Sequence, residues 1–560
     1  LKLKDNVTFN TDRSELRNLE TYSYFVNQTS GQFDIIFDYE SNGVNKRHTL
    51  QIKEFIDTIY GSGIYGDGNY LNKTDEDFSY PSDTNIKSLI GITHWTNTSS
   101  NSSEVVEIFY SFVRKDSQNI RDSSSSGGYR STDPDDVILD PTEGFKTAVK
   151  EILQDTESIF KIKFTELTGE NIDKASIRYV LWDSPSAEAS GYSWLPSEEA
   201  SFVFILKPDN NDFSAGTYAY GTIRHETGHA LGLVHPFEDN LIDSEFNSLV
   251  YSIMSYSAVY DTLETNSYDI DSSGSYIINR SSGKSTDSID WQIYDIAALK
   301  HLYGLRSDYN IGDNTYSFNA EPKFQNIHDL GGYDTIDLSA STSDNDIKFG
   351  QIDLNGGAVF QVGNFQLTWS GDQYQTGQVI TTSLDTKIEK FIGSSGIDNV
   401  ILGETSDTIL TNGGDDKIYS VGIYKSASSI RIDAGSGDDF VNVFIDTDEV
   451  NSLLDIDGGI GYDYLVIYNN ETEIDFSLYL KHFDSFENFK FSNSSPQNIT
   501  IDEEDFIELS GTYLGISAGD EDTIILPEGA EEDTSIINDY YDYYVLNDIT
   551  IAISDNSLIG

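Results

Sequence analysis

Short segments in which hydrophobic and polar side chains alternate recur along much of this chain of 560 residues. Alternation with a period of two is typical of β-strands that bury one face. We expect strands of this kind at residues 32–37, 105–113, 160–167, 175–182 and 201–206. Strands therefore dominate the expected secondary structure.

Helical spacing of apolar residues is found in fewer places. Apolar residues recur three and four positions apart over residues 145–153, directly after a Pro-Thr pair that serves as a helix start signal. A second helix is expected over residues 289–303, and Gly304 ends it. With a further helix around residues 225–229, this order of elements predicts a mixed sheet with a helix packed beneath it.

One stretch of the chain carries a metal-ligand spacing. Starting at His225 it reads His-Glu-Thr-Gly-His-Ala-Leu-Gly-Leu-Val-His. On a helix His225 and His229 lie at i and i+4, so both imidazoles project from one face and can hold one zinc ion beside Glu226. Gly232 can take a positive φ, which lets the chain leave the helix and return His235 to the metal with one coordination position left open.

The alternative for such histidines is a structural role, because a His pair on an apolar face is more often core than ligand. Three histidines at fixed offsets, in a chain with only 8, favour the metal site. The only methionine of the chain, Met254, follows in Ser-Ile-Met-Ser-Tyr, which ends at Tyr256. Its position soon after the histidines favours a role near them over simple filling of the core.

The pattern HExxHxxGxxH followed by a Met-containing turn resembles the metzincin clan of metalloproteases. Within that clan the chain resembles the serralysins, secreted bacterial proteases with a calcium-binding repeat domain. Residues 293–304 (Ile-Tyr-Asp-Ile-Ala-Ala-Leu-Lys-His-Leu-Tyr-Gly) and 331–337 (Gly-Gly-Tyr-Asp-Thr-Ile-Asp) carry the same likeness. It extends over residues 85–470 and fades outside them.

The resemblance implies roles for individual residues. Glu226 would be the general base that activates water, without a covalent acyl-enzyme. Met254 would form a hydrophobic floor under the zinc ligands, and Tyr256 would ligate zinc in the resting enzyme and then stabilise the tetrahedral intermediate. Residues 201–206 are expected to form an edge strand that could pair with the main chain of an extended peptide substrate; an ordinary half-buried strand is the equal alternative.

A nine-residue repeat occupies the third part of the chain. Asp398, Asp407 and Asp416 fall nine residues apart in copies of GGxGxDxUx, where U is apolar, and Asp439 and Asp463 mark two further copies. Calcium takes six to eight oxygen ligands and fits between such turns, although acidic β-turns without metal are the alternative. The glycines expected to shape these turns are Gly393, Gly396, Gly414, Gly435, Gly437, Gly458, Gly459 and Gly461.

The repeats vary in how well they match the pattern. The copy at residues 458–466 alone fits it completely, whereas Leu402, Thr405, Thr411 and Asn412 stand where the pattern has glycine. Some calcium sites are therefore expected to be weakened or lost.

The composition of the chain excludes several classes of binding partner and site. The formal net charge is −60, so nucleic acids and anionic membranes would be repelled, and divalent cations are the natural partners. The chain has no cysteine, which excludes disulfides and thiolate zinc sites. No apolar run reaches the roughly 18 residues of a membrane-spanning helix. Because the chain begins without Met, we expect a processed or truncated form.

The resulting prediction is an α+β metzincin catalytic domain followed by an all-β parallel β-roll or β-sandwich domain. We expect a β-containing region of unclear role at 1–84, a zinc protease domain at 85–305, an RTX-like calcium-binding β-roll at 306–470, and a β-rich extension with a possible secretion signal at 471–560.

The predicted function is a secreted, extracellular bacterial endopeptidase with one catalytic Zn²⁺ and several structural Ca²⁺. We expect export in one step as an unfolded chain and a monomeric folded protein. Its expected partners are protein or peptide substrates and a proteinaceous inhibitor. A catalytically silent calcium-binding surface or adhesion protein is the alternative. An astacin-like or matrix-type protease would explain the zinc motif but not the repeats.

Overall fold

The structure is a computed structural model of the whole chain. It describes residues 22–29, 32–41, 44–51, 73–75, 79–97, 104–115, 137–184, 187, 189–197, 200–238, 241–257, 268–270, 276–278, 289–318, 324–341, 352–362, 378–403, 405–406, 408–420, 430–444, 454–468, 472–475, 477, 482–492, 496–502, 513–517, 522–536, 541–546, 549–554 and 558–559.

The chain divides into two compact units. The first comprises Leu1–Ile242 and Ala298–Leu305, and the second comprises Asp243–Ala297 and Arg306–Gly560. This division is coarser than the four predicted segments, so their boundaries stay predictions. No helix among the described residues is long and apolar enough to cross a membrane.

The first unit contains a six-stranded mixed sheet in the order β10-β11-β9-β6-β8, with β7 also paired to β9. Only β7 and β10 run antiparallel to their neighbours. The strands are β6 (Val106–Phe112), β7 (Val137–Ile138), β8 (Ile162–Glu166), β9 (Ile177–Asp183), β10 (Gly191–Ser193) and β11 (Ser201–Leu206). Four of the strands expected from alternation are thereby confirmed.

The expected edge strand is wrong. β11 pairs with β9 on one side and with β10 on the other, where Gly191 lies opposite Ile205. On this side of the sheet the edge among the described residues is therefore β10, a three-residue strand, while β8 stands at the other end of the order.

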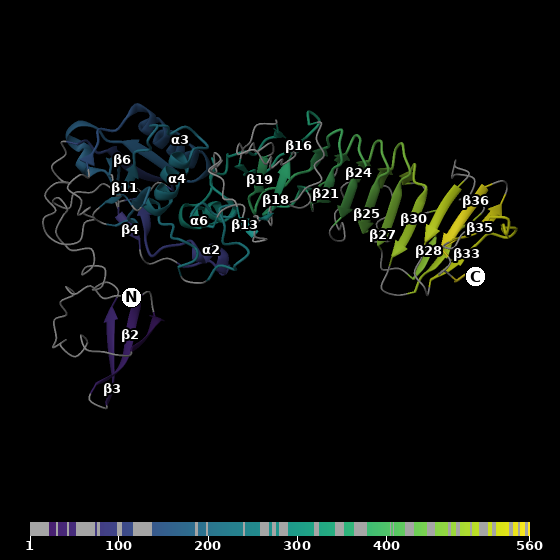
Figure 1. Ribbon diagram of the computed structural model, residues 1–560, viewed down its shortest axis with the longest axis horizontal. Helices are drawn as coiled ribbons and strands as arrows, with labels where there is room; N and C mark the ends of the chain where they lie inside the picture. The colour runs from purple at the N-terminus through teal and green to yellow at the C-terminus, as the bar shows by residue number, and fades with distance from the viewer. Residues whose placement is uncertain are drawn as a thin grey trace. The chain divides into compact units, whose positions relative to one another are not determined.

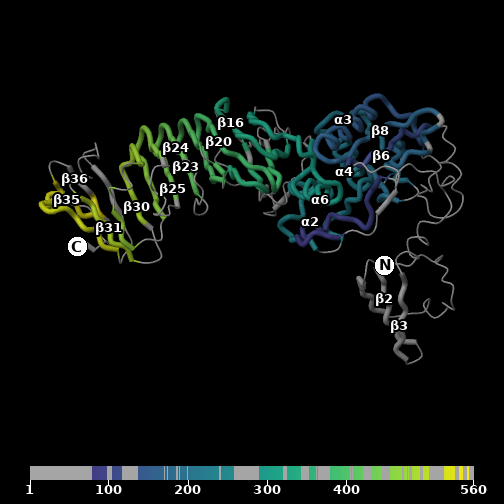
Figure 2. The backbone as a smooth tube through the Cα atoms, turned by 180° about the vertical axis from the view of Figure 1, so that it is seen from behind, coloured from purple at the N-terminus to yellow at the C-terminus, as the bar shows by residue number. Residues whose placement is uncertain are grey.

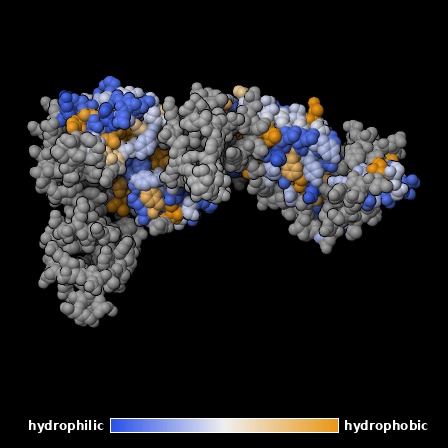
Figure 3. Space-filling view, viewed as in Figure 1, coloured by the Kyte–Doolittle hydropathy of each residue, from blue (hydrophilic) through white to orange (hydrophobic). Residues whose placement is uncertain are grey.

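Two helices pack with this sheet. In α3 (Glu143–Ile159) the Thr142 side chain caps the first turn by accepting a 3.3 Å hydrogen bond from Phe145 N, as the sequence predicted. α4 (Tyr218–Ala230) contacts β10 and β11, and Thr227 Oγ1 lies 3.1 Å from the hydroxyl of the fully buried Tyr179 on β9. Figure 1 shows both helices beside β6 and β11. Hydrophilic residues gather on the surface over the region of α3 (Figure 3).

Smaller elements complete the described part of the first unit. β1 (Tyr22–Thr29), β2 (Gln32–Ser41) and β3 (Val44–Gln51) form an antiparallel sheet, in keeping with the strand predicted at 32–37. β4 (Lys73–Asp75) pairs with β5 (His94–Thr96), and the short helix α2 (Thr84–Ser88) and the 3₁₀ helix η3 (Gly169–Lys174) connect other segments. α6 (Ile293–Tyr303) begins in the second unit and ends in the first.

The second unit is built mainly from parallel strands. It contains a seven-stranded sheet, β14-β16-β20-β22-β24-β26-β29, and a ten-stranded sheet that begins β17-β21-β23-β25-β27-β30-β32, and successive strands of the chain from β20 to β27 alternate between the two. Figure 2 shows β16, β20 and β24 following one another along this unit. Parallel strands with few helices agree with the predicted β-roll.

The core of this unit lies between the two sheets. In register across the first sheet stand Ile336, Phe391, Ile409, Ile432 and Ile456. Across the second sheet the matching positions are Ile352, Val400, Ile418, Val441 and Leu465. All ten side chains are 0–1% exposed, so these two rows provide the hydrophobic stabilisation of the stacked turns.

Strand pairing continues without change of direction past residue 470. β27 pairs in parallel with β30, β30 with β32 and β32 with β36, after which β35 and β34 pair antiparallel at the end of the sheet. A four-stranded parallel sheet, β28-β31-β33-β37, accompanies them. The antiparallel hairpin covers the last parallel edge, a common protection against edge-to-edge association.

The strands of the second unit have the following bounds: β12 (Tyr268–Ile270), β13 (Tyr276–Ile278), β14 (Thr315–Ser317), β15 (Phe324–Ile327), β16 (Thr335–Asp337), β17 (Ile352–Asp353), β18 (Val359–Val362), β19 (Gln378–Thr382), β20 (Lys390–Ile392), β21 (Asn399–Leu402), β22 (Thr408–Leu410), β23 (Lys417–Ser420), β24 (Ile430–Asp433), β25 (Phe440–Phe444), β26 (Leu454–Asp457), β27 (Tyr464–Tyr468), β28 (Glu473–Asp475), β29 (Phe483–Asp484), β30 (Asn488–Ser492), β31 (Asn498–Thr500), β32 (Tyr513–Ser517), β33 (Thr523–Ile525), β34 (Glu531–Glu532), β35 (Tyr541–Leu546), β36 (Ile549–Ser554) and β37 (Leu558–Ile559).

Candidate metal centre

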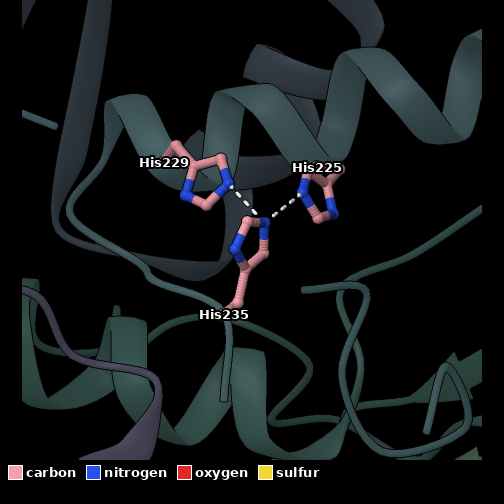
Figure 4. Close-up of side chains that lie close together, drawn as sticks. All are labelled: His225, His229 and His235. Atoms are coloured by element: carbon pink, nitrogen blue, oxygen red, sulfur yellow. Dashed lines mark hydrogen bonds between the residues drawn. The ribbon is translucent and has the colours of Figure 1, made fainter. Parts of the chain in front are cut away.

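Three histidines of the first unit converge on one point. His225 and His229 project from the same face of α4, and His235 reaches them from the segment that follows the helix (Figure 4). The Nε2 atom of His235 lies 3.3 Å from His225 Nε2 and 3.0 Å from His229 Nε2. The predicted metal-ligand set is therefore brought together, and it is the only such His, Cys, Asp or Glu group found among the described residues.

A glycine turn directs the third histidine toward the helix. α4 ends at Ala230 with Leu231 as its C-cap, after which Gly232 adopts φ +106°. Leu233 N donates to Gly228 O and Gly232 N donates to His229 O, each at 2.9 Å, which is the Schellman pattern of helix termination. A Cβ on Gly232 would lie 2.6 Å from Thr93 O, so the turn needs glycine for its φ and for space.

Buried hydrogen bonds hold the end of α4 and the segment after it. Trp95 Nε1 donates to Ala230 O at 2.8 Å, and the Tyr303 hydroxyl donates to Leu231 O at 2.7 Å. Gly91 N donates to Gly232 O and Val234 N donates to Leu89 O, both at 2.8 Å. The chain that carries His235 is therefore paired with residues far away in the sequence.

The second ring nitrogen of two histidines fixes their tautomers. His229 Nδ1 lies 2.8 Å from Leu233 O, and His235 Nδ1 lies 2.7 Å from Glu238 Oε1. Carbonyl and carboxylate oxygens only accept, so each Nδ1 donates and each Nε2 of a neutral ring carries a lone pair instead of a hydrogen. Burial, with His225 and His235 nearby, lowers the pKa of His229 well below its ordinary value, so this ring is neutral at pH 7.

Two lone pairs that face each other repel unless a cation lies between them. Nitrogens bound at 2.0–2.1 Å to a tetrahedral zinc ion lie about 3.3 Å apart. The observed separations of 3.0 and 3.3 Å fit that geometry. Neutral imidazole is also a preferred zinc ligand. The three imidazole rings therefore fit a zinc ion without any rearrangement.

Glu226 lies next to the first ligand and is 5% exposed. Burial raises the pKa of its carboxyl group to about 8. Gly191 of the edge strand lies against it, because a Cβ there would be 2.9 Å from Glu226 Cγ. Among the described residues Glu226 Oε2 has no hydrogen-bond partner. A neighbouring cation would favour the charged carboxylate and bring its pKa down.

Met254 and Tyr256 belong to the second unit. Met254 is fully buried, whereas Tyr256 is 67% exposed. The two residues just before Met254 are held by Asp295 of α6, whose carboxylate accepts from Ser252 Oγ at 2.6 Å and from Ile253 N at 2.9 Å. Their roles toward the metal stay predictions.

Four of the five repeat aspartates form a continuous row, while Asp407 lies outside the described residues. Asp398 N donates to Asp416 Oδ1 and Asp416 N to Asp439 Oδ1, both at 2.7 Å, and Asp439 N donates to Asp463 Oδ1 at 2.9 Å. All four side chains are buried. Each turn is therefore bonded to the next through one carboxylate oxygen.

The second oxygen differs along the row. In Asp398 it accepts from Ser394 N at 2.7 Å, whereas in Asp416, Asp439 and Asp463 it is buried without a hydrogen-bond partner among the described residues. Burial is the main cause that raises the pKa of these three groups, to about 8, 7 and 6 respectively. Buried carboxylate oxygens without donors are suitable ligands for a hard cation.

The predicted glycines lie in these turns. Positive φ values occur at Gly414, Gly435, Gly437 and Gly459. A Cβ on Gly461 would overlap Gly437 O, so stacked turns approach too closely there for a side chain. The remaining glycines singled out from the sequence, Gly393, Gly396 and Gly458, are also among the described residues.

Three acidic residues near these sites were not found from the sequence. Glu487 extends the aspartate row, since Asp463 N donates to its Oε2 at 2.7 Å, and Asp334 is a further buried carboxylate with an oxygen that has no hydrogen-bond partner among the described residues. Asp334 follows Gly331-Gly332, a partial repeat that could have signalled it. Glu238, the partner of His235, had no signal beyond its position three residues later.

Comparison with known proteins points to one group of relatives. The chain is 27% identical over 352 residues to a serralysin of Photorhabdus sp. (strain Az29), a match that covers 57% of this chain and 63% of that protein. It is 26% identical over 303 residues to a serralysin of Proteus mirabilis, covering 47% and 55% of the two chains. It is 29% identical over 235 residues to serralysin B of Dickeya chrysanthemi, covering 38% and 40%.

The chain thus spans from two fifths to just under two thirds of the length of these relatives. No protein-family model matches it. The similarities support a serralysin-like protease, as the resemblance predicted. The metzincin assignment and the RTX type of the repeats stay predictions.

Proposed function

We propose that this protein is a secreted, zinc-dependent endopeptidase that hydrolyses peptide bonds in proteins. The observation that carries the proposal is the convergence of three imidazole nitrogens at zinc-like separations beside a buried carboxyl group. Similarity to serralysins supports the same activity. His225, His229 and His235 would hold the ion, which would act as a Lewis acid on the scissile carbonyl and on the attacking water.

Glu226 would be the general base. Its carboxylate would take the proton from the attacking water and deliver it to the leaving amine. Its burial, with Gly191 packed against it, shields it from bulk solvent and strengthens its interaction with neighbouring charges. Tyr256 would donate a hydrogen bond to the developing oxyanion, with Met254 packing beneath the ligands.

The edge strand β10 would bind the substrate. It borders the sheet next to α4, and Gly191 brings its main chain against Glu226. An extended peptide that adds to a sheet edge gains main-chain hydrogen bonds with little dependence on its sequence. A peptide on β10 would therefore pass close to the proposed base.

Several calcium ions would stabilise the second unit. Asp416, Asp439 and Asp463 each offer a buried oxygen that lacks a donor, and Asp334 offers another. In a cytosol poor in calcium, repulsion among these groups would keep the unit loose, and millimolar calcium outside the cell would close it. Export in one step as an unfolded chain, followed by folding outside the cell, is consistent with this behaviour.

The test is cleavage of a protein substrate by the full chain, its Glu226→Gln variant and the matched control Glu151→Gln, an exposed glutamate of α3. We expect Glu226→Gln to retain zinc, measured by elemental analysis, and to lose nearly all activity, while Glu151→Gln stays active. Wild-type activity should vanish with a chelator and return with zinc and calcium. A Glu226→Gln variant with normal turnover, or wild-type protein that binds no zinc, would refute the proposal.

A further inference from the structure

We propose that Glu238 is a positioning residue for the metal centre, which orients His235 and strengthens its bond to zinc, with Phe237 supporting the ring. The inference rests on the proposed zinc site. It concerns how firmly the ion is held, and it adds a carboxylate outside the predicted ligands to the machinery of the site.

The ring of His235 is positioned differently from the rings of the other two ligands. His225 and His229 are set by the spacing of one helix, but His235 lies on the segment beyond its end. Two neighbours in the chain hold its ring. Phe237 stacks on it with ring centroids 5.2 Å apart and planes at 6°, and Glu238 Oε1 lies 2.7 Å from its Nδ1.

The backbone of this segment favours both contacts. Glu238 N donates to His235 O at 3.3 Å, which closes a turn over Pro236 and Phe237. The turn returns the side chain at position 238 to the histidine three residues before it. Pro236 fixes one backbone dihedral of the turn in advance, so little entropy is lost when the contacts form.

The chemical nature of the partner distinguishes His235 from His229. His229 donates to a neutral carbonyl oxygen, Leu233 O, whereas His235 donates to a carboxylate. A negative acceptor on Nδ1–H raises the basicity of Nε2 and fixes the tautomer in which Nε2 can bind a metal. Glu238 therefore supplies charge to the ligand that lies outside the helix.

If Glu238 instead served only to stabilise the fold, its removal would lower the stability of the metal-free protein. Its side chain is 56% exposed, and at such an exposed position even a charged pair contributes little to stability. Removing Glu238 should therefore leave the metal-free protein as stable as before while it weakens zinc binding. The two readouts separate a positioning role from a structural one.

The experiment uses the full chain with Glu238→Gln, Glu238→Ala, Glu238→Asp and the control Glu151→Gln. Zinc is removed with a chelator, and zinc affinity is measured by competition with a chromophoric chelator. We expect Glu238→Ala to lose about tenfold or more in affinity, the range found for outer partners of metal-bound histidines, and Glu238→Gln to lose less because an acceptor remains. Glu238→Asp should recover part of the loss.

Cobalt in place of zinc adds a spectroscopic signature. The visible absorption of the cobalt protein should shift in Glu238→Gln and stay unchanged in Glu151→Gln. The inference would be overturned if all Glu238 variants bound zinc as tightly as the wild type. It would also be overturned if the metal-free variants melted at a lower temperature than the metal-free wild type, by enough to account for the loss of zinc affinity. Wild-type protein that binds no zinc is a separate result, because it refutes the proposed function itself.

Discussion

The hydroxyl of Tyr303, the last residue of α6, donates a 2.7 Å hydrogen bond to the carbonyl oxygen of Leu231, the C-cap residue of α4. The same hydroxyl accepts from Trp95 N at 3.2 Å. Leu231 and Trp95 are both fully buried, so neither main-chain group can turn to water instead. One phenol group thus satisfies two buried groups just before the turn that leads to His235.

Replacing Tyr303 with Phe should therefore destabilise the protein although almost no volume is lost. Leaving buried main-chain groups without partners costs about 1–3 kcal/mol. Tyr218→Phe is the control, because Tyr218 is 65% exposed and should change the free energy of unfolding by less than about 0.5 kcal/mol. Urea denaturation of the metal-free proteins measures both. Equal effects of the two substitutions would contradict the role given to Tyr303.

Gly232→Ala should abolish tight zinc binding. Alanine would be strained at φ +106°, and its Cβ would lie 2.6 Å from Thr93 O, so the chain that carries His235 must move. Gly169→Ala is the matched control, because Gly169 also has a positive φ, +64°, but nothing lies within 4 Å of its Cβ position. The control should lose about 1–2 kcal/mol of stability from the backbone alone and keep its zinc. Zinc titration of both variants tests this prediction. Tight zinc binding by Gly232→Ala would contradict it, because the clash with Thr93 O would then be relieved without displacing His235.

The parts of the fold that sequence predicted well are those with local signals. Thr142 caps α3 because its hydroxyl reaches a main-chain N–H three residues later, and that relationship is visible in the sequence. The edge strand was misassigned because β10 has only three residues, too few to show a period of two. Its pairing with β11 is a contact between segments that no local pattern encodes.

The same distinction applies to the metal centre. The spacing of His225 and His229 follows from helix geometry, and Gly232 marks the helix end, so three ligands could be read directly. The approach of Gly191 to Glu226 could not, because it depends on how the sheet packs on α4. Asp334 was missed because its repeat is incomplete, and Glu487 because the repeat pattern has aspartate at that position.

An ion pair between a buried arginine and a partly exposed aspartate links α4 to α3 next to the histidines. Arg224 is 1% exposed, and its guanidinium group donates to Asp155 Oδ2 at 2.6 Å. Asp155→Ala would leave the buried cation without this carboxylate and should cost about 3 kcal/mol or more in the free energy of unfolding. The double variant Asp155→Ala with Arg224→Met should recover most of that loss, because the charge is gone as well. Denaturation curves of the three variants test the coupling, and additive losses would contradict it.

The repeat carboxylates should make the calcium-free protein less stable as the pH rises. Burial raises the pKa of Asp439 from 3.8 to about 7 in the folded state, with Asp416 at about 8 and Asp463 at about 6. At pH values between the pKa of these groups in the unfolded chain and their raised pKa in the folded state, the folded state holds more protons than the unfolded state. The stabilisation that results is complete below pH 4 and is lost as the pH rises toward 8. Thermal melts of the full chain in a calcium chelator, from pH 5 to 8.5, should show a falling melting temperature for the transition that calcium shifts.

Calcium should remove this dependence, since a bound cation favours the carboxylates and lowers their pKa values. Stabilisation by calcium should therefore be greatest at pH 8, where the repeat aspartates of the calcium-free protein repel one another most strongly. Asp439→Asn should flatten the calcium-free profile and reduce the gain from calcium, whereas Asp455→Asn, at a 69% exposed position, should change neither. The melting temperature of the calcium-free protein could instead rise between pH 5 and 8. These carboxylates would then be charged in the folded state without a cation, and the aspartate row would not require calcium.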